Sequence, residues 1–206
     1  ELAPVADIVG TSGNNTLTGT ANADVIYGNG GVDTINAGAG NDTVILTASS
    51  ISALTASTNT AAINGQAGVN TLKISGINQT MDLTNLTVNN KLDNFNVIDL
   101  KQGSGNKFKL HLDQVLSLAG GTDNAATAGV DESKMLVLQG NGGAQLNRLQ
   151  LVDAINWSSV TNLGGTSLQN TYGAEYGFEA GRSYTQYTNG VANLFVDQTL
   201  FVEALA

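Results

Sequence analysis

The chain has 206 residues and a formal net charge of −9, with 17 Asp and Glu against eight Lys and Arg, and it contains no cysteine. This balance argues against a nucleic-acid partner, because such binders neutralise phosphates with basic residues, and the lack of cysteine excludes disulfide cross-links. No apolar run approaches the ~20 residues of a membrane-spanning helix, so we expect no membrane insertion.

The composition favours an all-β fold with many tight turns. The chain contains 25 Gly, 24 Asn and a single Pro. Gly and Asn tolerate left-handed backbone angles, which tight turns require. Val, Ile, Leu and Thr occur in short bursts between these turns, as in short strands. A hydrophobic content of 41% is sufficient for a core, so we expect a folded chain and not a disordered one.

Residues 10–45 divide into four lines of nine residues that align without gaps. The lines are GTSGNNTLT (10–18), GTANADVIY (19–27), GNGGVDTIN (28–36) and AGAGNDTVI (37–45). The sixth position holds an oxygen-bearing side chain in every line: Asn15, Asp24, Asp33 and Asp42. The eighth position is always apolar: Leu17, Ile26, Ile35 and Val44.

These lines resemble the nonapeptide repeat of RTX (repeats-in-toxin) proteins, G-G-x-G-x-D-x-U-x with U apolar. The resemblance implies a parallel β-roll that binds Ca²⁺, in which six residues form a turn and three form a short strand. Oxygen ligands from carboxylates and turn carbonyls suit this hard cation. The implied ligand residues are Asp24, Asp42, Asp33, Asn15, Gly19, Gly28 and Gly30.

In a roll of this kind one nonapeptide is half a coil, so repeats two apart are stacked. We therefore expect Asp24 beside Asp42, and Asn15 beside Asp33. The Asn15/Asp33 site should bind more weakly, since asparagine supplies oxygen without charge. The alternative is a strand ladder rich in Gly and Asn that holds no metal.

We predict three regions along the chain. Residues 1–46 form the calcium β-roll and 47–64 form a linker or loop. Residues 65–206 form a β-rich module, packed on the roll as one unit. Within it, GQAGVNTLK (65–73) repeats the nonapeptide pattern in a shifted register.

Segments 70–120, 135–151 and 184–202 resemble parts of giant type I-secreted bacterial adhesins that carry RTX repeats. At Ala144 and Gln145 the chain departs from the acidic residue usual in that family. Alternating apolar residues independently predict short strands, in a β-sandwich or a β-solenoid. LDQVLSLAG (112–120) predicts one short helix, and Asn189-Gly190 predicts a two-residue hairpin turn.

Further candidate sites are predicted from single segments and not from a repeated pattern. Asp123, Asp131 and Asp99 are additional candidate calcium ligands, although 120–133 also fits a solvated acidic loop. A tyrosine-rich segment at 172–187 favours either a contact surface for a peptide or glycan, or tyrosines that cover the edge of the core. Its candidate ligand-binding residues are Tyr172, Tyr176, Arg182 and Tyr184.

No catalytic motif is present, and the single histidine, His111, lies in an alternating strand pattern, so we expect a non-enzyme. The expected function is an extracellular calcium-binding domain of a large RTX adhesin on a bacterial surface, which supports adhesion through a peptide or glycan ligand. The alternatives are a calcium-stabilised structural module near the secretion end, and a non-catalytic part of a secreted RTX enzyme. Ice binding is disfavoured because Asn29 and Gly38 interrupt the row begun by Thr11 and Thr20.

Overall fold

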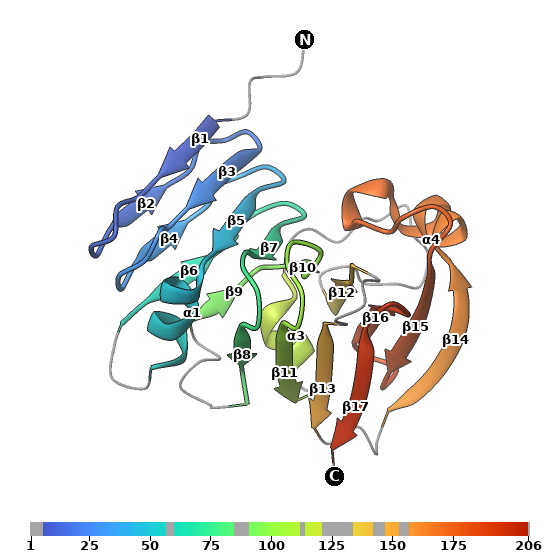
Figure 1. The fold of residues 1–206 in the computed structure, drawn as a ribbon. Helices are drawn as coiled ribbons and strands as arrows, with labels where there is room; N and C mark the ends of the chain where they lie inside the picture. Colours follow the sequence, from blue (N-terminus) through green and yellow to red (C-terminus); the bar gives the residue numbers. More distant parts are fainter. Residues whose placement is uncertain are drawn as a thin grey trace.

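The structure, a computed structural model, describes residues 6–56, 60–84, 91–111, 114–120, 134–141, 147–152 and 157–205. Its strands wind in successive coils along one axis, from β1 at one end to β14 and α4 at the other (Figure 1). The all-β class with a parallel β-roll is confirmed. Of the two architectures predicted for the later region, the parallel pairing matches the solenoid and not the sandwich.

The long sheet runs the whole length of the molecule, with strand order β1-β3-β5-β7-β10-β12-β16-β15-β14. Pairing is parallel from β1 to β16 and antiparallel for the last two pairs. Its strands are β1 (Ala6–Val9), β3 (Asp24–Tyr27), β5 (Thr43–Leu46), β7 (Thr71–Ile74), β10 (Val97–Asp99), β12 (Met135–Gln139), β16 (Asn193–Asp197), β15 (Ser183–Thr188) and β14 (Ser158–Gly164).

Two shorter parallel sheets form the other sides of the solenoid. The N-terminal sheet contains β2 (Thr16–Thr18), β4 (Thr34–Asn36), β6 (Ala62–Asn64) and β9 (Leu92–Asp93). The C-terminal sheet contains β8 (Thr80–Asp82), β11 (Lys107–His111), β13 (Arg148–Val152) and β17 (Phe201–Leu205).

Two helices occupy positions that strands hold in neighbouring coils. Successive coils are β5–α1–β6, β7–β8–β9 and β10–β11–α3. Helix α1 (Ala48–Thr55) therefore occupies the position that β8 has in the next coil, and helix α3 (Gln114–Leu118) occupies the position that β9 has in the preceding coil. Each helix lies against the edge strand of the shorter sheet beside it. Covering a sheet edge in this way prevents its free backbone groups from pairing with another chain.

The prediction of a linker or loop at 47–64 is corrected by the structure. The segment contains α1 and β6, and Ile51 and Leu54 of the helix are buried in the core. Thr47 caps the helix, its side-chain oxygen accepting a hydrogen bond from the Ser50 backbone. Among the small uncharged residues that suggested a linker, Ser50 of the helix is also buried. The prediction of a single helix is also incomplete, because α1 and α4 (Gly165–Tyr172) accompany the predicted helix at α3.

A continuous apolar ladder fills the interior. Paired residues of the long sheet form one inward row along the axis: Ile8, Ile26, Val44, Leu72, Ile98, Leu138 and Val196. From Ile26 onward these side chains are at most 1% exposed. The row crosses the predicted boundary between the roll and the later module, so the two regions share one core. None of the described helices is long and apolar enough to cross a membrane.

The last hairpin has a longer turn than predicted. β15 and β16 pair at Thr188 and Asn193, so the turn contains four residues, 189–192. Asn189 organises it, with Oδ1 accepting hydrogen bonds from the backbones of Val191 at 3.0 Å and Ala192 at 2.8 Å. Gly190 provides the left-handed angle, φ +86°, for which Asn-Gly was singled out.

A buried asparagine ladder holds the corner between the long and C-terminal sheets. The Asn106 backbone N–H donates to Asn147 Oδ1 at 2.9 Å, and the Gln79 N–H donates to Asn106 Oδ1 at 2.8 Å. Asn147 Nδ2 also donates to the Leu100 carbonyl, and both asparagines are at most 1% exposed. In the sequence, an asparagine comes directly before a strand in two successive coils, Asn106 before β11 and Asn147 before β13. The nonapeptide pattern does not include this feature.

We predict that Asn147→Ala lowers the free energy of unfolding by about 2–4 kcal/mol, because it leaves a buried N–H and a buried carbonyl without partners. The measurement is urea unfolding in saturating calcium. Gln150→Ala on the same sheet is the matched control, since its side chain is partly exposed, and it should cost less than about 1 kcal/mol. Equal losses would show that the ladder adds nothing to stability.

Candidate metal centre

Glycine-rich turns precede the N-terminal strands and stack in two columns. The first turn column contains residues 19–24, 37–42 and 65–70, which lead into β3, β5 and β7. The second turn column contains residues 10–15 and 28–33, which lead into β2 and β4. The predicted pairing therefore matches the stacking, with Asp24 next to Asp42 and Asn15 next to Asp33.

Within each column, a sixth-position side chain accepts a hydrogen bond from the backbone of the turn stacked before it, as Asp42, Asn70 and Asp33 do. The Asp24 N–H donates to Asp42 Oδ1 at 2.8 Å, and the Asp42 N–H donates to Asn70 Oδ1 at 2.9 Å. In the second column the Asn15 N–H donates to Asp33 Oδ1 at 2.9 Å. Stacking of the coils thus joins neighbouring turns of each column through a side-chain oxygen.

The predicted glycines lie where the turns allow no side chain. A Cβ built on Gly19 would lie 1.7 Å from the Ala37 carbonyl oxygen and 2.8 Å from Asp24 Oδ2. A Cβ on Gly28 would lie 2.7 Å from Asp33 Oδ2. Gly30 has φ +120°, which side-chain-bearing residues rarely adopt. Glycine at position 19 therefore lets the turn backbone approach the carboxylate of its own turn and the carbonyl of the next coil.

The carboxylates are buried without a compensating cation. Asp24 and Asp42 are 1% exposed and Asp33 is 4% exposed. Asp42 Oδ2 has no hydrogen-bond partner, and no ion pair reaches these three aspartates from the described residues. The sequence explains this, because no Lys or Arg precedes Lys73. A buried carboxylate without a charged partner is costly to ionise even when it accepts hydrogen bonds, and a proton or a cation relieves that cost.

The raised pKa values of Asp42 and Asp33 reflect the cost of burying a charged carboxylate. Burial raises the pKa of Asp42 to about 6, and repulsion from Asp24 adds to the rise, while the backbone hydrogen bond from Asp24 opposes it. Burial also raises the pKa of Asp33 and outweighs the hydrogen bond from Asn15. A divalent cation between the turns would remove the same penalty at neutral pH.

The residues present fit a calcium ion better than a transition metal. Within the described ranges, no three His, Cys, Asp or Glu side chains form a group that could hold a metal. An ion between Asp24 and Asp42 would therefore take its remaining ligands from turn carbonyls, such as the Ala37 carbonyl that approaches Gly19. An all-oxygen set with several backbone carbonyls suits Ca²⁺, which accepts ~6–8 ligands in flexible geometry.

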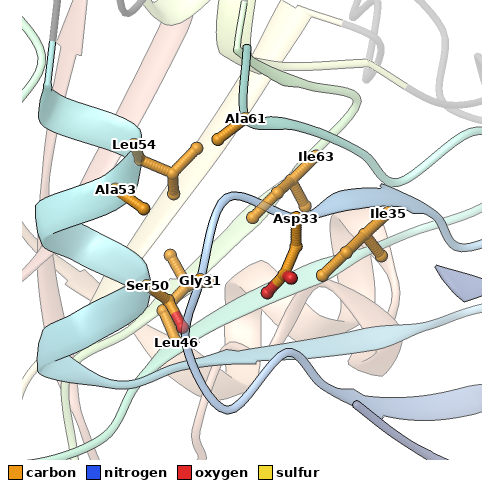
Figure 2. Close-up of a pocket in the computed structure, with 9 residues that line it drawn as sticks. All are labelled: Gly31, Asp33, Ile35, Leu46, Ser50, Ala53, Leu54, Ala61 and Ile63. Atoms are coloured by element: carbon orange, nitrogen blue, oxygen red, sulfur yellow. The ribbon is translucent and has the colours of Figure 1, made fainter. Parts of the chain in front are cut away.

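Helix α1 ends the second turn column. Ser50 of α1 lies near turn 28–33, and a Cβ on Gly28 would be 3.7 Å from Ser50 Oγ. Figure 2 shows the Asp33 carboxylate pointing toward Ser50 in the small pocket between this turn and α1. The first column, by contrast, continues to Asn70. The pocket is otherwise lined mainly by apolar or small side chains: Gly31, Ile35, Leu46, Ala53, Leu54, Ala61 and Ile63.

The additional candidate ligands are placed elsewhere or not described. Asp99 is 6% exposed; its Oδ2 lies 3.8 Å from Lys73 Nζ and its Oδ1 accepts from the Lys101 backbone at 2.8 Å. The charge of Asp99 is thus already compensated by Lys73, and the residue lies apart from both turn columns. Asp123 and Asp131 fall outside the described residues.

The tyrosine-rich segment forms a second hydrophobic core on the outer face of the long sheet. Tyr172, Tyr176 and Tyr184 are 9%, 2% and 0% exposed, and they pack with Phe178 and Phe195 beneath α4 and the 3-10 helix η3 (Ala174–Tyr176). Tyr184 Oη accepts a hydrogen bond from the Glu179 backbone at 2.9 Å. This burial fits the alternative in which the tyrosines cover the core, and it leaves them no open contact surface.

Arg182 is held in an ion network beside that core. Its Nη1 lies 2.9 Å from Asp197 Oδ2 and its Nε lies 3.0 Å from Glu179 Oε2. Lys101 reaches Glu179 Oε1 at 2.7 Å, and this contact is the main reason that the pKa of Glu179 is lowered. The guanidinium therefore has internal partners and links the cover to the sheet.

Comparison with protein families supports the geometry of the turn columns. Residues 9–44 match the family model of the RTX calcium-binding nonapeptide repeat, in four copies. The resemblance seen in the four lines is thereby confirmed, and Ca²⁺ is the ion that such repeats bind. RTX repeats are typical of secreted proteins. Comparison with curated proteins and with solved structures gave no match.

We expect Asp24→Ala and Asp42→Ala each to lower the melting temperature of the calcium-loaded protein by roughly 5 °C more than Asn15→Ala does, because each removes a charged ligand. Differential scanning calorimetry with and without calcium measures the effect. Equal shifts for the three variants would contradict the pairing of charged ligands in the first turn column.

The calcium-free protein should become less stable as pH rises from about 4.5 to 7. The folded-state pKa of Asp42, about 6, exceeds the ordinary value of 3.8, so the folded state binds the proton more tightly in this range. Its contribution is fully present below the unfolded pKa and is lost as pH rises through the folded pKa. Asp42→Asn should flatten this dependence in calcium-depleted buffer, as followed by melting temperature. An unchanged pH profile in the variant would exclude Asp42 as its source.

Proposed function

We propose that this chain is an extracellular, calcium-dependent, non-catalytic module of a large RTX adhesin, displayed on a bacterial surface after type I secretion. It would support adhesion to surfaces or host cells, including biofilm formation, through a peptide or glycan ligand. The observation that carries the calcium part is the stacking of buried Asp24 and Asp42 without a protein cation, inside the segment matched to RTX repeats. The adhesin context is supported by the resemblance of segments 70–120, 135–151 and 184–202 to adhesin sequences.

A structural role without a ligand is the second candidate. It is favoured by the burial of the tyrosines in the second core, which uses the side chains first considered for binding. A non-catalytic part of a secreted RTX enzyme remains a third proposal, which a catalytic motif in flanking sequence would favour.

Calorimetric titration of the chelator-treated chain with Ca²⁺ tests the metal function. We expect ion uptake, with a melting temperature that rises by roughly 5–10 °C at a hundredfold excess over the dissociation constant, since that excess stabilises by about 2.7 kcal/mol per site. Mg²⁺ at equal concentration is the control, because it dehydrates reluctantly and prefers strict octahedral sites. Absence of uptake, or equal melts in calcium and chelator, would refute the metal function.

A peptide and glycan array probed with calcium-loaded chain separates the two roles. Reproducible ligands that disappear in chelator would support adhesion. A folded, calcium-loaded chain that captures nothing would favour the structural module.

A further inference from the structure

The outer face of the C-terminal sheet carries an unusual concentration of basic side chains. Strand alternation buries Phe108, Leu110, Leu149 and Leu151, at 0% exposure, and turns their neighbours outward. We call this outward surface the cationic face. Its described side chains are Thr80, Asp82, Lys107, Lys109, His111, Arg148, Gln150, Val152, Phe201 and Glu203.

The cationic face differs in charge from the rest of the chain. It holds three of the eight Lys and Arg residues of a protein whose net charge is −9. Lys109 lies 3.3 Å from Asp82, and Arg148 lies 2.7 Å from Glu203. Lys107 makes no ion pair within 4.0 Å of any described residue. The pKa of Glu203 is lowered first by the Gln150 hydrogen bond, then by Arg148 and by the charge of Lys107, so the Lys107 ammonium acts on that carboxylate and can also attract an anion from solution.

An exposed aromatic ring lies beside these cations. Phe201 is 47% exposed, and the Arg148 guanidinium carbon lies 5.2 Å from the centre of its ring. The Arg148 side chain is itself 51% exposed. The pair offers an apolar ring surface next to hydrogen-bond donors, a combination that suits a sugar ring bearing a carboxylate.

The parallel register orders these groups in rows along the solenoid axis. Lys107, Arg148 and Phe201 are direct neighbours on successive strands, which lie about 4.8 Å apart. A second row contains Lys109, Gln150 and Glu203, where Gln150 Nε2 donates to Glu203 at 2.6 Å. The face is therefore a regular strip of polar groups suited to a linear polymer.

We propose that the cationic face binds an acidic polysaccharide, whose uronate carboxylates contact Lys107 and Arg148 while a sugar ring packs on Phe201. This inference rests on the proposed adhesive function and names its ligand class. The cationic face shares no residue with the turn columns, so the two can fail separately.

Two other polymers match the face less well. An extended peptide binds sheets chiefly through free backbone groups at an edge, which here β17 and β8 provide, whereas Lys107 and Arg148 lie on β11 and β13, which are paired on both sides and present side chains alone. A nucleic acid needs many cations to release counterions, and the chain opposes it with a net charge of −9. A polyuronate has carboxylates for the cations and hydroxyls for Asp82, Gln150 and Glu203.

The test is calorimetric titration of the calcium-loaded chain with hyaluronan oligosaccharides, which alternate a uronate with a neutral sugar. We expect binding that weakens as salt rises. Lys107→Gln should weaken binding about three- to tenfold. The matched control Lys73→Gln, the same exchange on the long sheet, should change it less than about twofold. Phe201→Ala should weaken binding without altering its salt dependence, and melting curves verify that each variant is folded.

Lack of hyaluronan binding by the folded, calcium-loaded chain overturns the inference, as do equal losses from the two lysine variants. Equally tight binding of duplex DNA overturns it as well, because the face would then attract any polyanion. A chain that takes up calcium but does not bind hyaluronan leaves the calcium function standing. A chain that binds hyaluronan but takes up no calcium refutes the calcium function alone.

Discussion

The N-terminal coils depend on how the charge of their buried carboxylates is neutralised. Stacking the coils places Asp24 and Asp42 in contact, each almost fully buried, with an oxygen of Asp42 that no protein donor reaches. Two neighbouring carboxylates in such surroundings repel each other and lose their hydration. The region supplies no lysine or arginine, so the charge must be met from solution by protons or by a divalent ion. Folding of the roll and binding of calcium are therefore coupled.

The coils that follow make similar backbone contacts with amides in place of carboxylates. Asn70 Oδ1 accepts a hydrogen bond from the Asp42 N–H at the end of the first turn column, and Asn147 Oδ1 accepts one from the Asn106 N–H at another corner of the solenoid. An amide oxygen accepts the same hydrogen bond as a carboxylate, without a charge to be neutralised. The solenoid thus passes from coils that require an ion to coils that are satisfied by their own side chains, while the apolar ladder continues through both.

The later coils protect the outer face of the long sheet by aromatic packing. Phe178 and Phe195 have ring centres 5.2 Å apart in an edge-to-face arrangement, and α4 covers them. Arg182 joins this cover to Asp197 of β16, and this partly buried pair is costly to break because the buried Asp197 carboxylate would be left unpaired. The outer face of the C-terminal sheet has no comparable cover among the described residues, and its cations lie at the surface.

The local pattern determined the nonapeptide period, the inward apolar position and the pairing of Asp24 with Asp42, because each depends on spacing along the chain. Alternating apolar residues predicted short strands in the later region, and the segment 112–120 predicted the helix at α3. Only the tertiary structure decided that 47–64 forms a helix and a strand, since its small residues become informative when the sheet they pack on is known. Burial of the tyrosines, the partners of Arg182 and the row of Lys107, Arg148 and Phe201 were likewise decided by contacts between distant segments. Spacing along one strand does not specify which strand lies beside it, and that neighbour determines whether a side chain is buried, paired or exposed.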